Sequence, residues 1–187
     1  MDSDEVFLTG LDVFGAVVHD VGDDAWGSPS PCQGWTARDV VGHIVGVLDA
    51  GNAILRGDKP EWSGGQPSDV VGDDPVGRWD SASAKARASL VSVDLDRVVE
   101  SPMGARTIRQ GLAFPGLDLH LHAWDLGRAT GIEVEVAPEV QEFTRTTLSP
   151  MPEQMVRSAG VFGPEQPAPE DPTPTEAFMA WTGRTPR

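Results

Sequence analysis

Aspartate and histidine, two residue types that bind metal ions, occur at helical spacing near the middle of this sequence. In the segment 117–129, Asp118 and His122 are four residues apart and Asp125 follows three residues later, so all three share one stripe of a helix. A carboxylate oxygen together with an imidazole nitrogen suits zinc, iron, nickel or manganese. The same spacing also occurs in ordinary surface ion pairs, so it allows either a metal site or an ion pair.

His43 is a second source of a metal ligand. It lies on a strongly predicted helix that begins at Thr36, where Asp39 completes a capping signal, and ends near Arg56. At about 100° per residue, His43 falls at the border of the apolar arc of that helix, so its ring faces inward or nearly so. A buried histidine bonded to a backbone carbonyl is the alternative to a metal ligand.

The other histidines and the single cysteine are assigned structural roles. His120 lies roughly 160° round a regular helix from His122, so the two cannot share one ion, and we expect it beside Trp124. His19 is expected at the surface, close to the end of the first helix. Cys32 precedes a helix N-terminus, which acidifies thiols, but packing is the usual role of a free cysteine and is the role expected here.

Hydrophobic periodicity places these residues on the elements of an all-α protein. Turn-forming residues separate the predicted helices, above all in the segment 57–79, which is long enough to act as a lid. Residues 91–113 predict a short hairpin or an irregular crossing, and residues 151–174 a proline-rich wrap. The predicted helices span residues 4–20, 36–56, 80–90, 117–129, 138–148 and 175–181. The tryptophans are expected in the core or pinning loops rather than in a ligand cage: Trp26, Trp35, Trp62, Trp79, Trp124 and Trp181.

The composition excludes several classes of function. A chain of 187 residues suits one domain, and 39% hydrophobic with 23% charged residues is typical of a globular protein. The formal charge of −15 disfavours nucleic acid and anionic membranes as partners, because both bind through Lys and Arg. No apolar run is long enough to span a bilayer. The acidic N-terminus does not resemble a secretory signal and one cysteine forms no internal disulfide, so we expect a cytoplasmic protein.

Three stretches of the chain resemble the DinB/YfiT-like metalloenzyme superfamily. They are SPCQGWTARDVVGHIVG, FPGLDLHLHAWDLGRATG and FMAWTGRTP, which together reach across nearly the whole chain in order. More narrowly, they are similar to the actinobacterial branch containing the mycothiol-dependent maleylpyruvate isomerase N-terminal domain. The resemblance implies a four-helix bundle with long loops and a short C-terminal helix, in a single DinB-like domain over residues 1–187.

The resemblance also implies a divalent metal, commonly zinc or nickel, held by a histidine of the second helix and two ligands of a later one. These positions fall on His43, Asp118 and His122, the same residues that helix geometry selects. The chain departs from the isomerase-like members at two points. They carry Glu where this chain has Asp118, which bears on metal affinity and metal choice, and they carry an additional C-terminal domain, which bears on isomerase activity.

Three protein ligands leave a metal position for an outside ligand, as in catalytic sites. The resemblance favours a low-molecular-weight thiol such as mycothiol, held as thiolate and ready to add to an electrophilic carbon. A thiol transferase or isomerase is therefore predicted, with a small-molecule thiol and an electrophile as partners, acting as a monomer or homodimer. The alternatives are a metal-dependent hydrolase that activates water and a metal- or ligand-binding helical module without catalysis.

Two further residues near the predicted ligands are candidates for supporting roles. Asp125 is one turn beyond His122 and is predicted to orient a ligand, while Arg128 is predicted to bind a carboxylate of the thiol or the substrate. Ion pairs at the surface or at the helix end are the alternative for both residues.

Overall fold

The computed structural model describes residues 1–60, 64–100, 104–157 and 162–186. The chain separates into two compact units, Asp2–Val134 and Glu135–Arg187, here called the bundle and the C-terminal region. The bundle contains every predicted metal ligand. The prediction of one domain over residues 1–187 stays a prediction.

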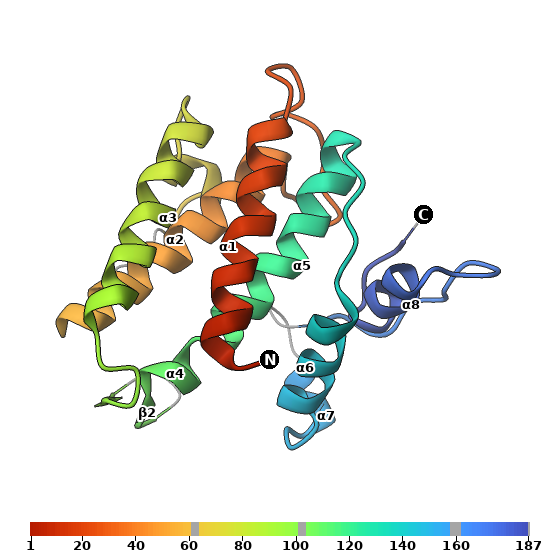
Figure 1. Ribbon diagram of the computed structural model, residues 1–187. Coiled ribbons are helices and arrows are strands. Elements are labelled where there is room, and N and C mark those ends of the chain that lie inside the picture. The colour runs from red at the N-terminus through yellow and green to blue at the C-terminus, as the bar shows by residue number, and fades with distance from the viewer. Residues whose placement is uncertain (61–63, 101–103, 158–161, 187) are drawn as a thin grey trace. The chain divides into compact units, whose positions relative to one another are not determined.

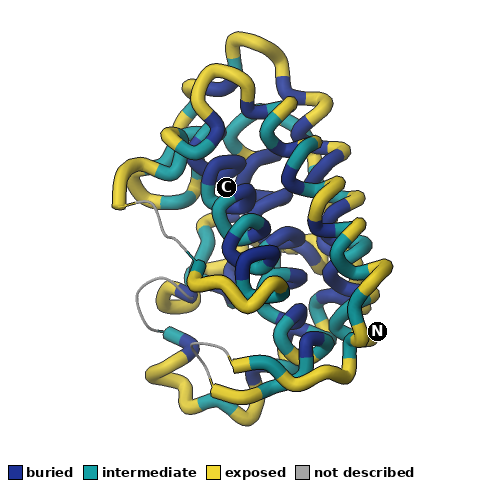
Figure 2. Tube along the Cα trace, turned by 90° about the vertical axis from the view of Figure 1, so that its left-hand side faces the viewer, coloured by how far each residue is buried: buried dark blue, intermediate teal, exposed yellow. Residues whose placement is uncertain are grey.

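Four long helices form the bundle (Figure 1). They are α1 (Ser3–Asp20), α2 (Ala37–Arg56), α3 (Pro75–Ser92) and α5 (Ala113–Thr130). Helix α1 packs against α3 and α5, and α2 packs against the same two helices, so each long helix has two neighbours. Buried positions recur along these helices (Figure 2), and Phe14, Ile44 and Trp79 are among the largest side chains that are almost fully buried. The predicted all-α four-helix bundle is confirmed.

Local chemistry fixes both ends of α2. At its start, the Thr36 hydroxyl accepts from the Asp39 amide, while the Asp39 carboxylate accepts from the Thr36 amide at 2.8 Å. At its end, Gly57 adopts the left-handed conformation, with a φ of 83°. The second carboxylate oxygen of Asp39 accepts from the Ser68 amide at 3.0 Å. Burial raises the pKa of Asp39, but these hydrogen bonds from Thr36 and Ser68 outweigh it and hold the pKa below its ordinary value.

Two helices begin earlier than predicted, and each has a proline in its first turn. Helix α3 starts at Pro75 rather than at residue 80, with Asp74 as its N-cap residue. Helix α5 starts at Ala113 rather than at residue 117, with Pro115 inside its first turn. The first-turn amides of a helix have no helical acceptor, so a proline there loses no hydrogen bond. Both prolines are therefore part of a helix start and do not mark the end of a loop.

The segment predicted as a lid contains a short 3-10 helix, η1 (Pro67–Val70), which packs against α2. A Cβ atom added to Gly42 would overlap the carbonyl oxygen of Pro67, so the two backbones meet at this glycine. Residues 61–63, which include Trp62, lie outside the described residues. A lid function for residues 57–79 stays a prediction.

A small hairpin follows α3, as predicted for residues 91–113. Strand β1 (Val98–Val99) pairs with β2 (Arg106–Thr107) in antiparallel register, Val98 opposite Thr107. The single-turn helix α4 (Ile108–Gly111) comes next and leads directly into α5.

The C-terminal region consists of α6 (Pro138–Leu148), α7 (Glu153–Val156) and α8 (Pro174–Trp181). Helices α6 and α8 lie where they are predicted, whereas α7 is a single turn inside the predicted proline-rich wrap. The Trp181 ring stacks on Phe178 with centroids 5.8 Å apart, and the Arg145 guanidinium carbon lies 4.3 Å from the Trp181 centroid. An aromatic and cationic cluster thus holds this region together.

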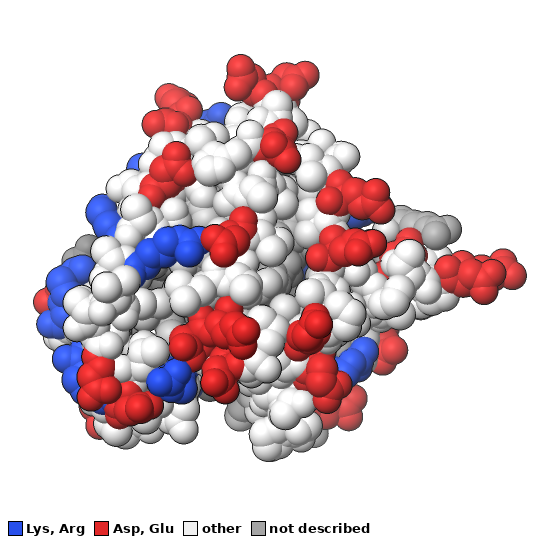
Figure 3. Space-filling model, in the orientation of Figure 1, with Lys and Arg blue, Asp and Glu red and all other residues white. Residues whose placement is uncertain are grey.

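Carboxylate side chains are spread over the face of the protein shown in Figure 3, in agreement with the formal charge of −15. A surface of this kind repels phosphate backbones. In the part of the chain that the structure describes, no helix combines the length and the apolar character needed to cross a membrane.

Candidate metal centre

Three side chains converge where α2 packs against α5. The His43 Nε2 atom lies 2.9 Å from Asp118 Oδ2, and the His122 Nε2 atom lies 3.4 Å from Asp118 Oδ1. The two imidazole rings meet edge to face, with centroids 4.9 Å apart. One donor atom from each of the three residues lies within 4.8 Å of the others. The structure therefore brings together the three residues selected from the sequence.

Helix geometry explains this convergence. Asp118 and His122 lie one turn apart on the same face of α5, because four residues make slightly more than one helical turn. His43 lies seven residues after Thr36, so the capping interaction that starts α2 also sets the rotational position of this histidine. Short-range interactions within α2 and within α5 thus determine where the metal-binding side chains lie on each helix.

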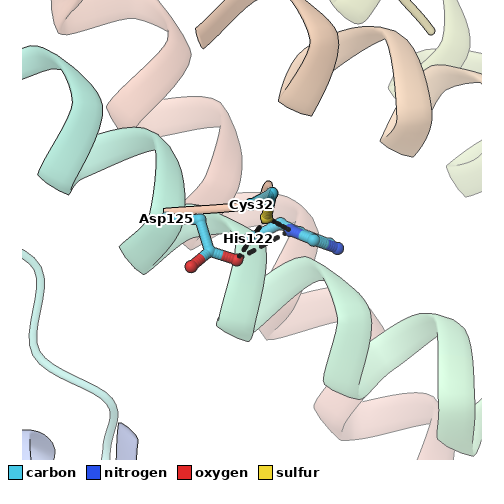
Figure 4. Close-up of side chains that lie close together, drawn as sticks. All are labelled: Cys32, His122 and Asp125. Atoms are coloured by element: carbon cyan, nitrogen blue, oxygen red, sulfur yellow. Dashed lines mark hydrogen bonds and ion pairs between the residues drawn. The ribbon is translucent and has the colours of Figure 1, made fainter. Parts of the chain in front are cut away.

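Behind His122 lies a second carboxylate. Asp125 is fully buried and its Oδ2 atom is 2.9 Å from His122 Nδ1 and 3.4 Å from the Cys32 sulfur (Figure 4). When the Nδ1–H group donates a hydrogen bond to Asp125, Nε2 is the nitrogen that is directed toward Asp118. A carboxylate behind a ligating histidine is the usual arrangement at metal sites, and this contact is what an orienting role for Asp125 requires.

Two donor groups share His122, and they differ in access. One consists of His43, Asp118 and His122, and the other of Cys32, His122 and Asp125. The side chains of His43 and Asp118 are 29% and 34% exposed, whereas that of Asp125 is 0% exposed. The first group is therefore the more accessible to an outside ligand, which a catalytic site needs.

The donor chemistry and spacing of the first group fit a metal ion. Imidazole nitrogens bind zinc at about 2.0–2.1 Å and carboxylate oxygens at about 2.0–2.2 Å, so two donors on one ion lie at most about 4 Å apart. The donor separations of 2.9 and 3.4 Å fall inside that limit. His43, Asp118 and His122 could therefore hold one ion after small side-chain movements.

Interactions between Asp118 and the histidines shift the pKa values of Asp118 and His122. Burial raises the pKa of Asp118, but the His122 charge and hydrogen bonds from both histidines outweigh it and hold that pKa far below its usual value. Burial lowers the pKa of His122, but Asp118, together with hydrogen bonds to Asp118, Asp125 and Cys32, raises it well above 6.5. The His122 side chain is 9% exposed and that of Asp118 is 34% exposed, so this pair is partly buried.

Comparison with known proteins places the bundle in a family. Residues 7–127 match the family model described as the mycothiol maleylpyruvate isomerase N-terminal domain. The chain belongs to this family. The matched segment contains His43, Asp118, His122, Asp125 and Cys32 and ends within α5, before the C-terminal region begins.

Relatives of the whole chain and of its fold are also found. An uncharacterized protein, found in two strains of Mycobacterium tuberculosis, is 28% identical over 182 residues, covering 94% of this chain and 94% of the relative. The crystal structure of a histidine-to-alanine mutant of the mycothiol-dependent maleylpyruvate isomerase matches with a TM-score of 0.63 and 16% identity, covering 80% of this chain and 68% of that chain. This structural likeness shows that the two proteins share a fold.

Two further residues lie beside this candidate centre where the sequence did not predict them. Cys32 was assigned to packing, but it is half-buried with its sulfur 3.8 Å from His122 Nδ1. The half-buried Trp35 ring lies with its centroid 5.1 Å from that of His43 and 5.9 Å from that of His122. The turn before α2 places both, since the Trp35 amide donates to the Cys32 carbonyl. Their closeness to Thr36 in the sequence was the available signal, because a residue just before a helix start stays close to its first turns.

The remaining candidates have other neighbours. Arg128 is exposed and its guanidinium carbon lies 5.7 Å from the centroid of the Trp124 ring, and its role in binding a carboxylate stays a prediction. His120 is buried, and its Nε2 atom lies 3.1 Å from the Val6 carbonyl oxygen of α1. Burial lowers the pKa of His120. His19 is at the surface as expected, paired with Asp80 at 2.8 Å.

Proposed function

We propose that the protein is a metal-dependent enzyme of the mycothiol-dependent maleylpyruvate isomerase or thiol S-transferase type. His43, Asp118 and His122 would hold one divalent ion, zinc in the first place and nickel in the second. The supporting observation is the convergence of these three donors on the exposed side of His122, with Asp125 behind it. Membership of the family supports the thiol chemistry in preference to hydrolysis.

The residues of the site have distinct roles in this proposal. When bound, the ion would supply the Lewis acidity that keeps a small thiol such as mycothiol in its thiolate form, the form that adds to an electrophilic carbon. Asp125 holds the Nδ1 proton of His122 and so presents Nε2. The partial exposure of His43 and Asp118 gives a small thiol access. The Trp35 ring covers one side of the two histidines and limits the access of water there.

Metal content tests the ligand set. Purified protein supplied with zinc or nickel is expected to retain about one equivalent per chain, and His43→Ala and His122→Ala to lose it. His19→Ala is the matched control, because His19 is exposed and its ion pair is with Asp80, not with a residue of the candidate centre. Elemental analysis measures the metal and circular dichroism verifies the fold. A folded wild-type chain that takes up neither metal would overturn the proposal.

Asp125→Asn tests whether this carboxylate positions His122. The variant keeps the size of the side chain but removes the negative charge of the group that accepts the hydrogen bond from His122 Nδ1. Metal affinity, measured by competition with a chelator, is expected to fall by roughly 10–100-fold without loss of the fold. Unchanged affinity would remove Asp125 from the proposal while leaving the three ligands in place.

Thiol consumption tests the reaction class. Mycothiol with a bimane or a halogenated aromatic electrophile is expected to be consumed by the metal-loaded wild type and not by His122→Ala. No consumption with any small thiol, together with metal-dependent cleavage of esters or amides, would indicate the hydrolase. Metal binding with neither activity would indicate the binding module.

A further inference from the structure

The bundle contains a cavity of about 300 Å³ that the proposed chemistry does not use. It lies around the second half of α2, where the hairpin, α4 and the start of α5 also contribute to its wall. Most of the wall is apolar, including Phe7, Leu48, Ile54, Leu55, Leu90 and Phe114. His43, Asp118 and His122 are not among the described residues that line it. Small-molecule sites in proteins begin at about this volume.

A buried polar residue is part of the cavity wall. Asn52 lines the cavity and is 7% exposed. Its Oδ1 atom accepts from the Ser89 hydroxyl at 2.9 Å, but its Nδ2 atom has no hydrogen-bond partner among the described residues. An unsatisfied buried donor costs free energy, and such groups are uncommon in folded proteins. A ligand that offers an acceptor to Nδ2 would remove this cost.

The charge of the wall indicates the kind of acceptor. Arg106 on β2 is the only charged side chain among the described residues that line the cavity. A positive charge in an otherwise apolar wall favours an anionic head group, and the apolar remainder favours a hydrocarbon body. An apolar cavity of about half this volume is already large enough to bind benzene in an engineered protein.

We propose that this cavity binds a small organic acid with an apolar body, such as a medium-chain fatty acid. Its carboxylate would accept a hydrogen bond from Asn52 Nδ2 and lie near Arg106, while its chain would fill the space between α2, α3 and α5. This inference does not depend on the metal, because the ligand meets other residues.

A glycine gives a way to close the cavity. Gly51 lines it, and a Cβ atom added there would meet no atom within 4 Å, so a larger side chain can enter the space without a clash. Gly46 lies on the same helix and its added Cβ is equally unobstructed, but it is not among the residues lining the cavity. Gly51→Leu and Gly46→Leu therefore form a matched pair.

Calorimetric titration with decanoate tests the proposal on the full-length protein. Wild type and Gly46→Leu are expected to bind decanoate with equal affinity, and Gly51→Leu to show no binding. Asn52→Leu, which keeps the branched shape of the side chain and removes the donor, is expected to weaken binding roughly tenfold. Decan-1-ol is expected to bind more weakly than decanoate, since it lacks the charge that Arg106 favours.

Two outcomes would overturn the proposal: no heat of binding with wild type, or equal binding by wild type and Gly51→Leu. Thermal unfolding checks that Gly51→Leu is folded, and we expect a raised melting temperature because the leucine fills the cavity and favours the helix. His43→Ala is expected to bind decanoate as wild type does. Failure of the metal assignment and failure of the cavity assignment are therefore separate results.

Discussion

The side-chain contacts that stabilise the bundle differ from those that stabilise the C-terminal region. In the bundle, long helices share an aliphatic and aromatic core and approach closely at glycines. In the C-terminal region, the helices are shorter and the Trp181 ring contacts two aromatic rings and two guanidinium groups. The family match covers only the bundle, whereas the mycobacterial relatives align over 94% of the chain. Family membership therefore supports chemistry in the bundle, and the C-terminal region is a feature shared with those relatives.

The largest expected effect tests the close approach in the bundle. Gly42→Ala places a Cβ against the Pro67 carbonyl, a backbone atom that cannot rotate away, and we expect a loss of about 3 kcal/mol of unfolding free energy. Gly46→Ala on the same helix meets no atom within 4 Å and is expected to gain up to about 1 kcal/mol from helix propensity. Urea unfolding measures both. Equal effects would show that the contact between η1 and α2 is not restrictive.

The next effect tests whether the C-terminal region depends on its aromatic cluster. Trp181→Ala removes the ring that Phe162, Phe178, Arg145 and Arg157 contact, and we expect it to cost about 2–3 kcal/mol, below the range for a fully buried tryptophan. Hydrogen exchange should lose protection in α8, while metal content stays at the wild-type level. Loss of metal would contradict the separation of roles between the two regions.

A smaller effect tests the capping carboxylate of the bundle. The two carboxylate oxygens of Asp39 accept three hydrogen bonds, and Asp39→Asn replaces one of these oxygens by a nitrogen that cannot accept and removes the charge, so we expect a cost of about 1–2 kcal/mol at pH 7. Because the folded-state pKa of Asp39 is lowered, its contribution is complete above its unfolded pKa of about 3.9 and is lost as the pH falls through the folded value. The difference between variant and wild type in urea unfolding should therefore shrink below about pH 4. A difference that is independent of pH would assign the cost to packing.

The smallest effect concerns an exposed cation in the C-terminal region. Arg145→Met keeps a long side chain but removes the charge above Trp181, and we expect a loss of about 0.5–1 kcal/mol. Arg145→Lys keeps the charge and is expected to lose less. Thermal unfolding at low and high salt separates the contribution of the charge from that of side-chain packing. Equal losses in both variants would show that guanidinium stacking, and not charge, is the stabilising contribution.

The sequence predicted those features that short-range chemistry encodes. Thr36 with Asp39 and the glycine at residue 57 placed both ends of α2, and the interval between Asp118 and His122 placed both on one face of α5. These features need only neighbours within a helical turn or two. The helix starts that contain Pro75 and Pro115 are harder to predict, because proline occurs both in loops and in the first turn of a helix.

Features that depend on contacts between distant segments were not predictable from spacing. Cys32 lies against His122 and Asp125 only because the turn before α2 folds over α5, a contact across about ninety residues. The cavity beside Asn52 depends on residues from five or more elements and on a polar atom left without a partner. The spacing of residues within one segment cannot predict a cavity whose wall is formed by several helices and strands.

The double role of the Asp39 carboxylate has a consequence for how this family can vary. One oxygen closes the start of α2 and the other holds the amide of Ser68, so both sides of the intervening segment are anchored to a single side chain. A change in the number of residues between 57 and 66 can then leave the position of His43 opposite α5 unaltered. The length of the chain between α2 and η1 can therefore vary while the candidate centre keeps its geometry.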